Sequence, residues 1–85
     1  IDSQRWKMNG LIPLSMVDGN KEVTVVAINA GRGLQARLFS LGLIPGVTIK
    51  VLSNSRPGPV RISIKDTRLA LGWGVAQKII VSEPR

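Results

Sequence analysis

The segment that most constrains the fold of this chain is Gly31–Gly46, which reads GRGLQARLFSLGLIPG. It is the one stretch in which a helical period is followed by a complete stop signal. At roughly 100° per residue, Leu34, Leu38 and Leu41 fall within an arc of about 60° and form one apolar stripe. We therefore predict a short helix whose three leucines are buried against a sheet.

The end of this helix is marked by glycine and proline. Gly42 follows the last apolar position and can adopt the left-handed conformation without steric cost, which places Leu43 back against the core. Pro45 prevents the helix from resuming, and Pro45 and Gly46 suit the central positions of a type II turn. The alternating segment Val47–Val51 then predicts a strand.

Five short segments rich in β-branched residues show the alternation typical of strands. In the first of them both faces are mostly apolar, which predicts a strand covered on both sides. The predicted strands are Glu22–Asn29, Val47–Leu52, Val60–Lys65, Arg68–Leu71 and Lys78–Ser82. With one helix inserted after the first strand, they predict a small, partly open β-barrel, because closure hides strand edges.

The segments between the strands are rich in turn residues. Ser53–Pro59 is predicted as a loop, Asp66-Thr67 as a hairpin turn and Gly72–Ala76 as a single helical turn. The stretch Asn9–Asn20 lacks a regular period and contains Pro13, so we expect an irregular lead-in that lies on the core.

The composition excludes most familiar catalytic sites. The chain has 85 residues, enough for one small domain, and contains neither cysteine nor histidine. Disulfides, thiolate or imidazole metal sites and Ser-His or Cys-His catalysis are therefore excluded. We expect residues 8–85 to form the domain and residues 1–7 to be a foreign or disordered lead. No apolar run approaches the ~18 residues that span a bilayer.

The formal net charge of +7 leaves two interpretations open. A basic surface attracts nucleic acid, anionic lipid or an acidic protein. The lysines and arginines are, however, spread singly from Arg5 to Arg85, which favours a solubilising role over one basic face.

Several of these residues together resemble the ferrous iron transport protein A (FeoA) family over about Leu11–Val81. The matching positions are Leu14-Ser15, Gly19, Val23–Ile28, the run Arg37–Gly46, Leu69-Ala70-Leu71, Ala76 and Ile79-Ile80-Val81. The run Arg37–Gly46 also resembles the SH3-like C-terminal domain of iron-dependent repressors.

The resemblance implies an SH3-like β-barrel of about five strands. It also implies a small cytoplasmic, non-enzymatic module that binds and modulates a membrane ferrous iron transporter with a GTPase domain, at the inner face of the membrane. The structural part of the motif is Leu38, Leu41, Gly42, Leu43, Pro45 and Gly46.

The chain departs from the family pattern at three places. Ala36-Arg37 stands where the family often has two arginines, which puts a paired basic contact in doubt. Leu41 replaces a frequent methionine and keeps the apolar character. Gly72-Trp73-Gly74 stands where charged residues are usual, so a partner surface there would be altered.

The expected partner-binding residues lie on the predicted helix: Arg32, Gln35, Arg37 and Phe39. Phe39 lies roughly 140° from Leu34 and should be exposed near Arg32 and Gln35. It is either an interface anchor or an ordinary exposed side chain. Arg37 lies at the edge of the buried stripe, where its stem can lie along the barrel.

Trp73 is expected to fill one end of the barrel rather than to stand exposed as a binding platform. Gly31-Arg32-Gly33 follows a strand and opens a helix, as phosphate-binding loops do, but it lacks the lysine and threonine that end a nucleotide loop. We expect no nucleotide there.

No metal site, cofactor or enzymatic activity is expected. Oxygen-only ligands suit hard cations better than ferrous iron, and only Asp18 and Glu22 are close in sequence. No pair of carboxylates is placed for acid-base catalysis.

Two other functions remain open. The first is a small barrel that binds nucleic acid; it is disfavoured because only Trp6, Phe39 and Trp73 are available to stack on bases. The second is an SH3-like regulatory domain that binds a peptide, although the chain has no tyrosine for an aromatic groove. Whichever function holds, exposed barrel edges and Phe39 would allow weak self-association, but nothing in the sequence requires it.

Overall fold

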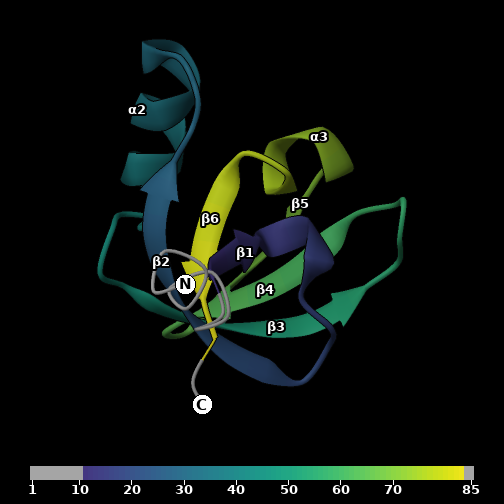
Figure 1. The fold of residues 1–85 in the computed structure, drawn as a ribbon. Helices are drawn as coiled ribbons and strands as arrows, with labels where there is room; N and C mark the ends of the chain where they lie inside the picture. Colours follow the sequence, from purple (N-terminus) through teal and green to yellow (C-terminus); the bar gives the residue numbers. More distant parts are fainter. Residues whose placement is uncertain (1–10, 84–85) are drawn as a thin grey trace, which may run out of the picture.

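The structure, a computed structural model, describes residues 11–83 (Figure 1). The expected lead Ile1–Lys7 lies outside the described residues. In chain order the described elements are β1 (Leu11–Pro13), η1 (Leu14–Met16), β2 (Lys21–Ile28), α2 (Arg32–Ser40), β3 (Thr48–Asn54), β4 (Val60–Ile64), β5 (Thr67–Leu71), α3 (Trp73–Ala76) and β6 (Ile79–Ser82). The prediction of a mainly β fold with one short inserted helix is confirmed.

All strand pairs are antiparallel and form one sheet in the order β1-β6-β2-β3-β4-β5. The two end strands, β1 and β5, do not pair with each other in the described part of the chain, so the curved sheet stays open along one seam. Both helices lie at the same end of the sheet (Figure 1). Neither helix within residues 11–83 is long and apolar enough to cross a bilayer.

The helix stop has the hydrogen bonds of a Schellman motif. The Leu43 N–H donates to Leu38 O at 2.9 Å, and the Gly42 N–H donates to Phe39 O at 2.9 Å. Gly42 has φ +98°, the left-handed conformation that its position demands. The predicted end of the helix is therefore confirmed.

The turn after the helix also has the predicted form. The Val47 N–H donates to Ile44 O at 3.1 Å, which closes a four-residue turn, and Gly46 has φ +98° at its third position. The Gly46 N–H then donates to Val25 O at 2.7 Å, so this turn is tied directly to β2.

Within residues 11–83 the core is one cluster of sixteen buried apolar side chains, to which Leu38 and Leu43 belong and against which the half-buried Leu34 packs. The prediction is wrong for Leu41, whose side chain is 45% exposed. Leu43 folds back beneath the last helical turn and fills the core there. Leu41, at the C-cap, is consequently left at the surface.

In β2 the predicted alternation fails at a β-bulge. The register with β6 shifts between Val25 and Ala27, so Val25 and Ile28 are both buried although they are three residues apart. Val26 is 42% exposed, and the strand is not covered on both sides as predicted.

The first described residues form a strand where an irregular lead-in is predicted. Pro13 pairs with Ile80 at the edge of the sheet, where a missing donor is tolerated because one side of the strand has no neighbour. The next residues do lie on the core, since Leu14 and Val17 are fully buried. The β4–β5 turn lies at Lys65-Asp66, one residue before the predicted position.

Candidate functional site

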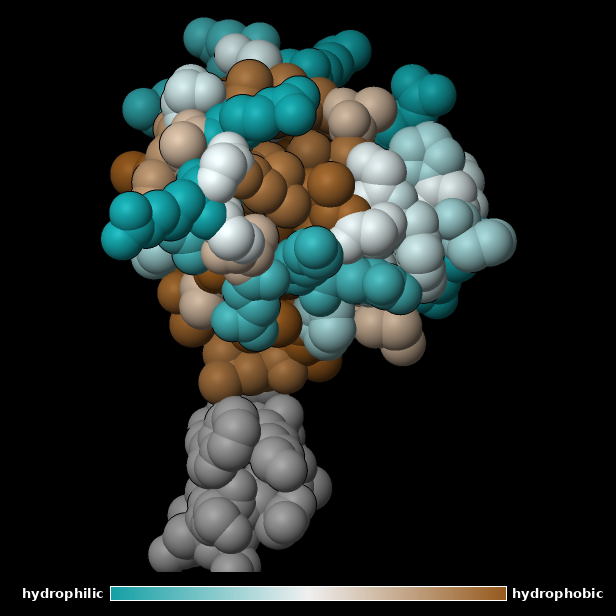
Figure 2. All heavy atoms as spheres, turned by 90° about the horizontal axis from the view of Figure 1, so that it is seen from above, coloured by the Kyte–Doolittle hydropathy of each residue, from teal (hydrophilic) through white to brown (hydrophobic). Residues whose placement is uncertain are grey.

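A groove of about 240 Å³ lies between α2 and the segment that joins β5 to α3. Its lining is apolar apart from one arginine, and it includes the surface leucine at the helix end. The lining residues are Leu34, Arg37, Leu38 and Leu41 from the helix side and Ala70, Leu71, Gly72 and Val75 from the other side. Figure 2 looks down on this end of the molecule and shows hydrophobic residues at the centre with hydrophilic residues around them.

Helical geometry assigns the predicted partner-binding residues to two faces of α2. Arg37 is on the groove side, about 60° from Leu34. Phe39 and Arg32 are roughly 140° and 160° from Leu34, and neither lines the groove. Of the four residues predicted for one partner surface, the structure therefore separates Arg37 from Phe39 and Arg32.

Gln35 has a structural contact instead of a free surface position. Its side-chain Nε2 donates to Ile28 O at 2.8 Å, and the side chain is half-buried. This bond ties α2 to the end of β2, which fixes how the helix stands over the sheet.

The exposed apolar side chains near the helix end are Phe39, Leu41 and Ile44, which are 42%, 45% and 46% exposed. Leu41 lines the groove, whereas the other two lie outside its lining. Trp73, at the start of α3, is half-buried and does not belong to the core cluster or to the side chains packed against it. That Trp73 fills a barrel end stays a prediction.

Sequence reasoning missed the far wall of the groove. Residues Ala70–Gly72 and Val75 are about thirty positions from α2, and no helical or strand period connects the two segments. The resemblance does include Leu69-Ala70-Leu71 among its matching positions, and that is the one sequence signal that points to this wall.

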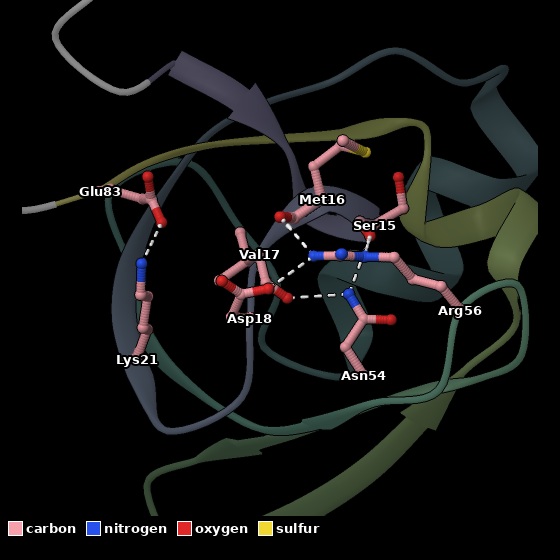
Figure 3. Close-up of polar contacts among 8 residues, drawn as sticks. All are labelled: Ser15, Met16, Val17, Asp18, Lys21, Asn54, Arg56 and Glu83. Carbon is pink, nitrogen blue, oxygen red and sulfur yellow. Dashed lines mark hydrogen bonds and ion pairs between the residues drawn. The ribbon is translucent and has the colours of Figure 1, made fainter.

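Apart from the groove, a polar cluster lies where the end of β3 meets η1 (Figure 3). The Asn54 side-chain amide donates to Ser15 O and to Val17 O, both at 2.8 Å. Its Oδ1 atom is buried without a hydrogen-bond partner in residues 11–83. Both amide donors are thus used to hold the short turn of η1 against the sheet.

Arg56 completes this cluster from the loop after β3. Its Nε donates to Ser15 O at 3.2 Å, and one terminal nitrogen donates to Met16 O and to the Asp18 carboxylate, both at 2.8 Å (Figure 3). The ion pair with Asp18 is largely exposed, so its share of stability is small. We assign this η1 clasp, formed by Asn54 and Arg56, to the fold.

The described residues hold no group of three or more Asp, Glu, His or Cys side chains that could bind a metal ion. Of the two ion pairs in residues 11–83, one joins Arg56 to Asp18 and the other joins Lys21 to Glu83 at 3.4 Å. The predicted binding residues Arg32 and Arg37 therefore form no ion pair in this part of the chain.

Comparison with known proteins identifies the family. The FeoA domain matches residues 12–83. A protein of Methanocaldococcus jannaschii named "Putative Fe(2+) transport protein A" is 41% identical over 73 residues, which cover 86% of this chain and 88% of that protein.

Solved structures agree. A crystal structure of an "Iron Uptake Regulatory Protein (FeoA)" is 36% identical, with a TM-score of 0.78 over 86% of this chain and 96% of that one. A FeoA protein from Chlorobium tepidum is 26% identical, with a TM-score of 0.76 over 85% of this chain and 70% of that one.

A manganese-dependent transcriptional repressor is 23% identical, with a TM-score of 0.78 over 86% of this chain and 41% of the repressor, and shares the fold alone. The SH3-like architecture predicted from the resemblance is confirmed. By the extent of both the domain match and the sequence identity, this chain belongs to the FeoA family of proteins associated with Fe(2+) transport.

Proposed function

We propose that this chain is a cytoplasmic, non-enzymatic module that binds a membrane ferrous iron transporter carrying a GTPase domain and modulates its activity. The observation that carries the proposal is the groove beside α2 in a member of an Fe(2+) transport family. Binding to the transporter would recruit the module to the inner face of the membrane.

The groove has the composition of a protein-binding surface. It combines apolar side chains, including the largely exposed Leu41, with the guanidinium of Arg37 at its border. Protein interfaces typically join an apolar centre to a polar rim, and arginine is enriched in them. An amphipathic helix or an extended segment of the transporter fits a groove of this kind.

A role in contact rather than in chemistry is supported by the residues available. The chain contains no histidine or cysteine. Within residues 11–83 no three acidic side chains lie close enough together to bind a metal ion. We therefore propose that iron itself is carried by the partner and that this module binds protein without a cofactor.

The decisive experiment is an NMR titration of isotope-labelled protein with the soluble GTPase domain of the transporter from the same organism. We expect chemical-shift changes concentrated on the groove residues of α2 and on Ala70–Val75. A short oligonucleotide serves as the control ligand. Shifts caused by the oligonucleotide alone would reject the transporter proposal in favour of nucleic-acid binding.

A matched pair of variants locates the binding face. Leu41→Glu places a charge in the groove, whereas Phe39→Glu places the same charge on the other face of the same helix, and the two parent side chains are almost equally exposed. We expect Leu41→Glu to weaken binding about tenfold or more and Phe39→Glu to leave it nearly unchanged. The reverse result would move the site to the face that carries Phe39 and Arg32.

A further inference from the structure

The strand β5 has an unpaired edge. It pairs with β4 on one side, and in residues 11–83 no strand lies on its other side. No turn or loop hydrogen bond involves the main chain of Thr67–Leu71 either. Because alternate residues of an edge strand turn their N–H and C=O groups away from the single neighbour, this edge can accept an added strand.

A second hollow, of about 320 Å³, lies over one face of β3, β4 and β5, the strand that carries this edge. Arg61 and Arg68 line it together with Leu52, Leu69 and Ala70, and no acidic residue lines it. The register pairs Arg61 with Ala70 and Ser63 with Arg68, so both arginines project from the same face of β4 and β5. They are diagonal neighbours, whose Cα atoms are about 7–8 Å apart.

The two arginines are available for a ligand. Both residues are exposed, and neither forms an ion pair or a side-chain hydrogen bond within residues 11–83. Asp66, in the hairpin turn beside Arg68, makes no ion pair with it. Two uncompensated like charges on one face are complementary to carboxylates at alternate positions of an extended segment, because alternate side chains of a strand point to the same face.

We infer that the β5 edge binds an extended acidic segment of a partner protein, which adds a strand to the sheet and places its carboxylates on Arg61 and Arg68. Main-chain hydrogen bonds supply the alignment, and the apolar side chains between the acidic ones point to the opposite face, the side on which Leu71 is buried. Nucleic acid fits this surface less well, since Phe39 and Trp73 lie on the helices and no aromatic side chain lines the hollow.

The inference for the β5 edge goes beyond the transporter proposal. The edge is separate from most of the groove, and its ligand is defined by its chemistry as an acidic extended segment. Ala70 is the one residue that lines both hollows. A partner with an acidic extended segment could therefore occupy the β5 edge and the groove together, but either surface can be tested alone.

The test uses the full chain and a blocked eight-residue peptide in which glutamate alternates with valine, titrated by NMR and calorimetry at low salt. We expect the largest amide shifts on Thr67–Leu71, and an affinity that falls as salt rises. Arg68→Gln should weaken binding about fivefold. Lys78→Gln, which removes one exposed charge outside the hollow, should change the affinity less than about twofold.

Two control peptides separate strand addition from charge attraction. The same sequence with every main-chain nitrogen methylated keeps its charge but has no N–H group to donate to an edge, and it should bind at least about tenfold more weakly. A lysine-valine peptide should not bind. Equal binding of the methylated peptide, equal effects of the two charge variants, or tighter binding of an oligonucleotide at the same arginines would each overturn the inference. None of these outcomes bears on whether the GTPase domain binds the groove.

Discussion

Arg37, in the groove, and Arg56, in the η1 clasp, place the same side chain in opposite settings. The Arg37 side chain makes no hydrogen bond or ion pair in residues 11–83 and borders apolar side chains. Arg56 makes three hydrogen bonds to one short turn. The clasp uses its donors to hold the fold, whereas the groove keeps an arginine and a leucine at the surface. Charge alone therefore does not indicate function in this basic chain.

The largest expected effect concerns the floor of the groove. Leu38→Ala should lower the free energy of unfolding by about 2–4 kcal/mol, because it leaves a cavity beneath α2 where the side chain is now 3% exposed. Leu41→Ala, on the same stripe, should cost less than about 1 kcal/mol, since that side chain is 45% exposed. Urea denaturation measures both values, and equal losses would show that Leu41 is buried after all.

The next effect concerns the clasp. Asn54→Ala should lower the free energy of unfolding by about 2 kcal/mol, because Val17 O loses its donor and Ser15 O keeps only the longer bond from Arg56. Ser40→Ala removes a similar bond, from a hydroxyl to Arg37 O, at an exposed site and should cost about 0.5 kcal/mol. Thermal unfolding compares the two variants. If Asn54→Ala also abolished partner binding while folded, the division between clasp and groove would be wrong.

The helix stop offers a test with opposite signs. Gly42→Ala should destabilise the protein by about 1–2 kcal/mol, because alanine is strained at φ +98°. Gly33→Ala, inside the same helix and with nothing within 4 Å of the added carbon, should stabilise it by up to about 1 kcal/mol. Two losses of similar size in chemical denaturation would contradict the assignment of Gly42 as the stop.

The smallest expected effect sharpens the role of Arg56. Arg56→Lys keeps the charge but cannot serve Ser15, Met16 and Asp18 at once, so stability should fall by about 1 kcal/mol. Arg32→Lys, at an exposed position without an ion pair in residues 11–83, should change stability by less than about 0.3 kcal/mol. A differential scanning calorimetry experiment with no difference between the two would show that the clasp depends on Asn54 alone.

The parts of the fold that the sequence predicts are those determined by neighbouring residues. The helix, its stop at Gly42 and the Pro45-Gly46 turn depend on local backbone preferences, and the structure confirms all three. Prediction fails where distant segments decide the outcome. The bulge at Val26 lies in the pairing with β6, and at the helix end Leu43 is buried in the core whereas Leu41 is exposed.

The candidate site was less predictable for the same reason. Its predicted residues all come from one helix, whereas the groove also needs Ala70–Gly72, which reaches α2 only in the folded barrel. Helical angles correctly separate Phe39 from the leucine stripe, but they cannot identify which face meets a second wall. The hydrogen bond from Gln35 to Ile28 O is likewise not predictable from the sequence, because no sequence pattern shows which main-chain oxygen a glutamine side chain will contact.

The pairing of the first strand with the last has a consequence for how this domain can be joined to other proteins. Leu11 on β1 is opposite Ser82 on β6, so the two ends of the described domain are separated by about one strand spacing, ~5 Å. A domain whose ends lie side by side can be inserted into a surface loop of a host chain without distortion of its own fold, and it can be exchanged between hosts in the same way. The same geometry makes it suited to circular permutation.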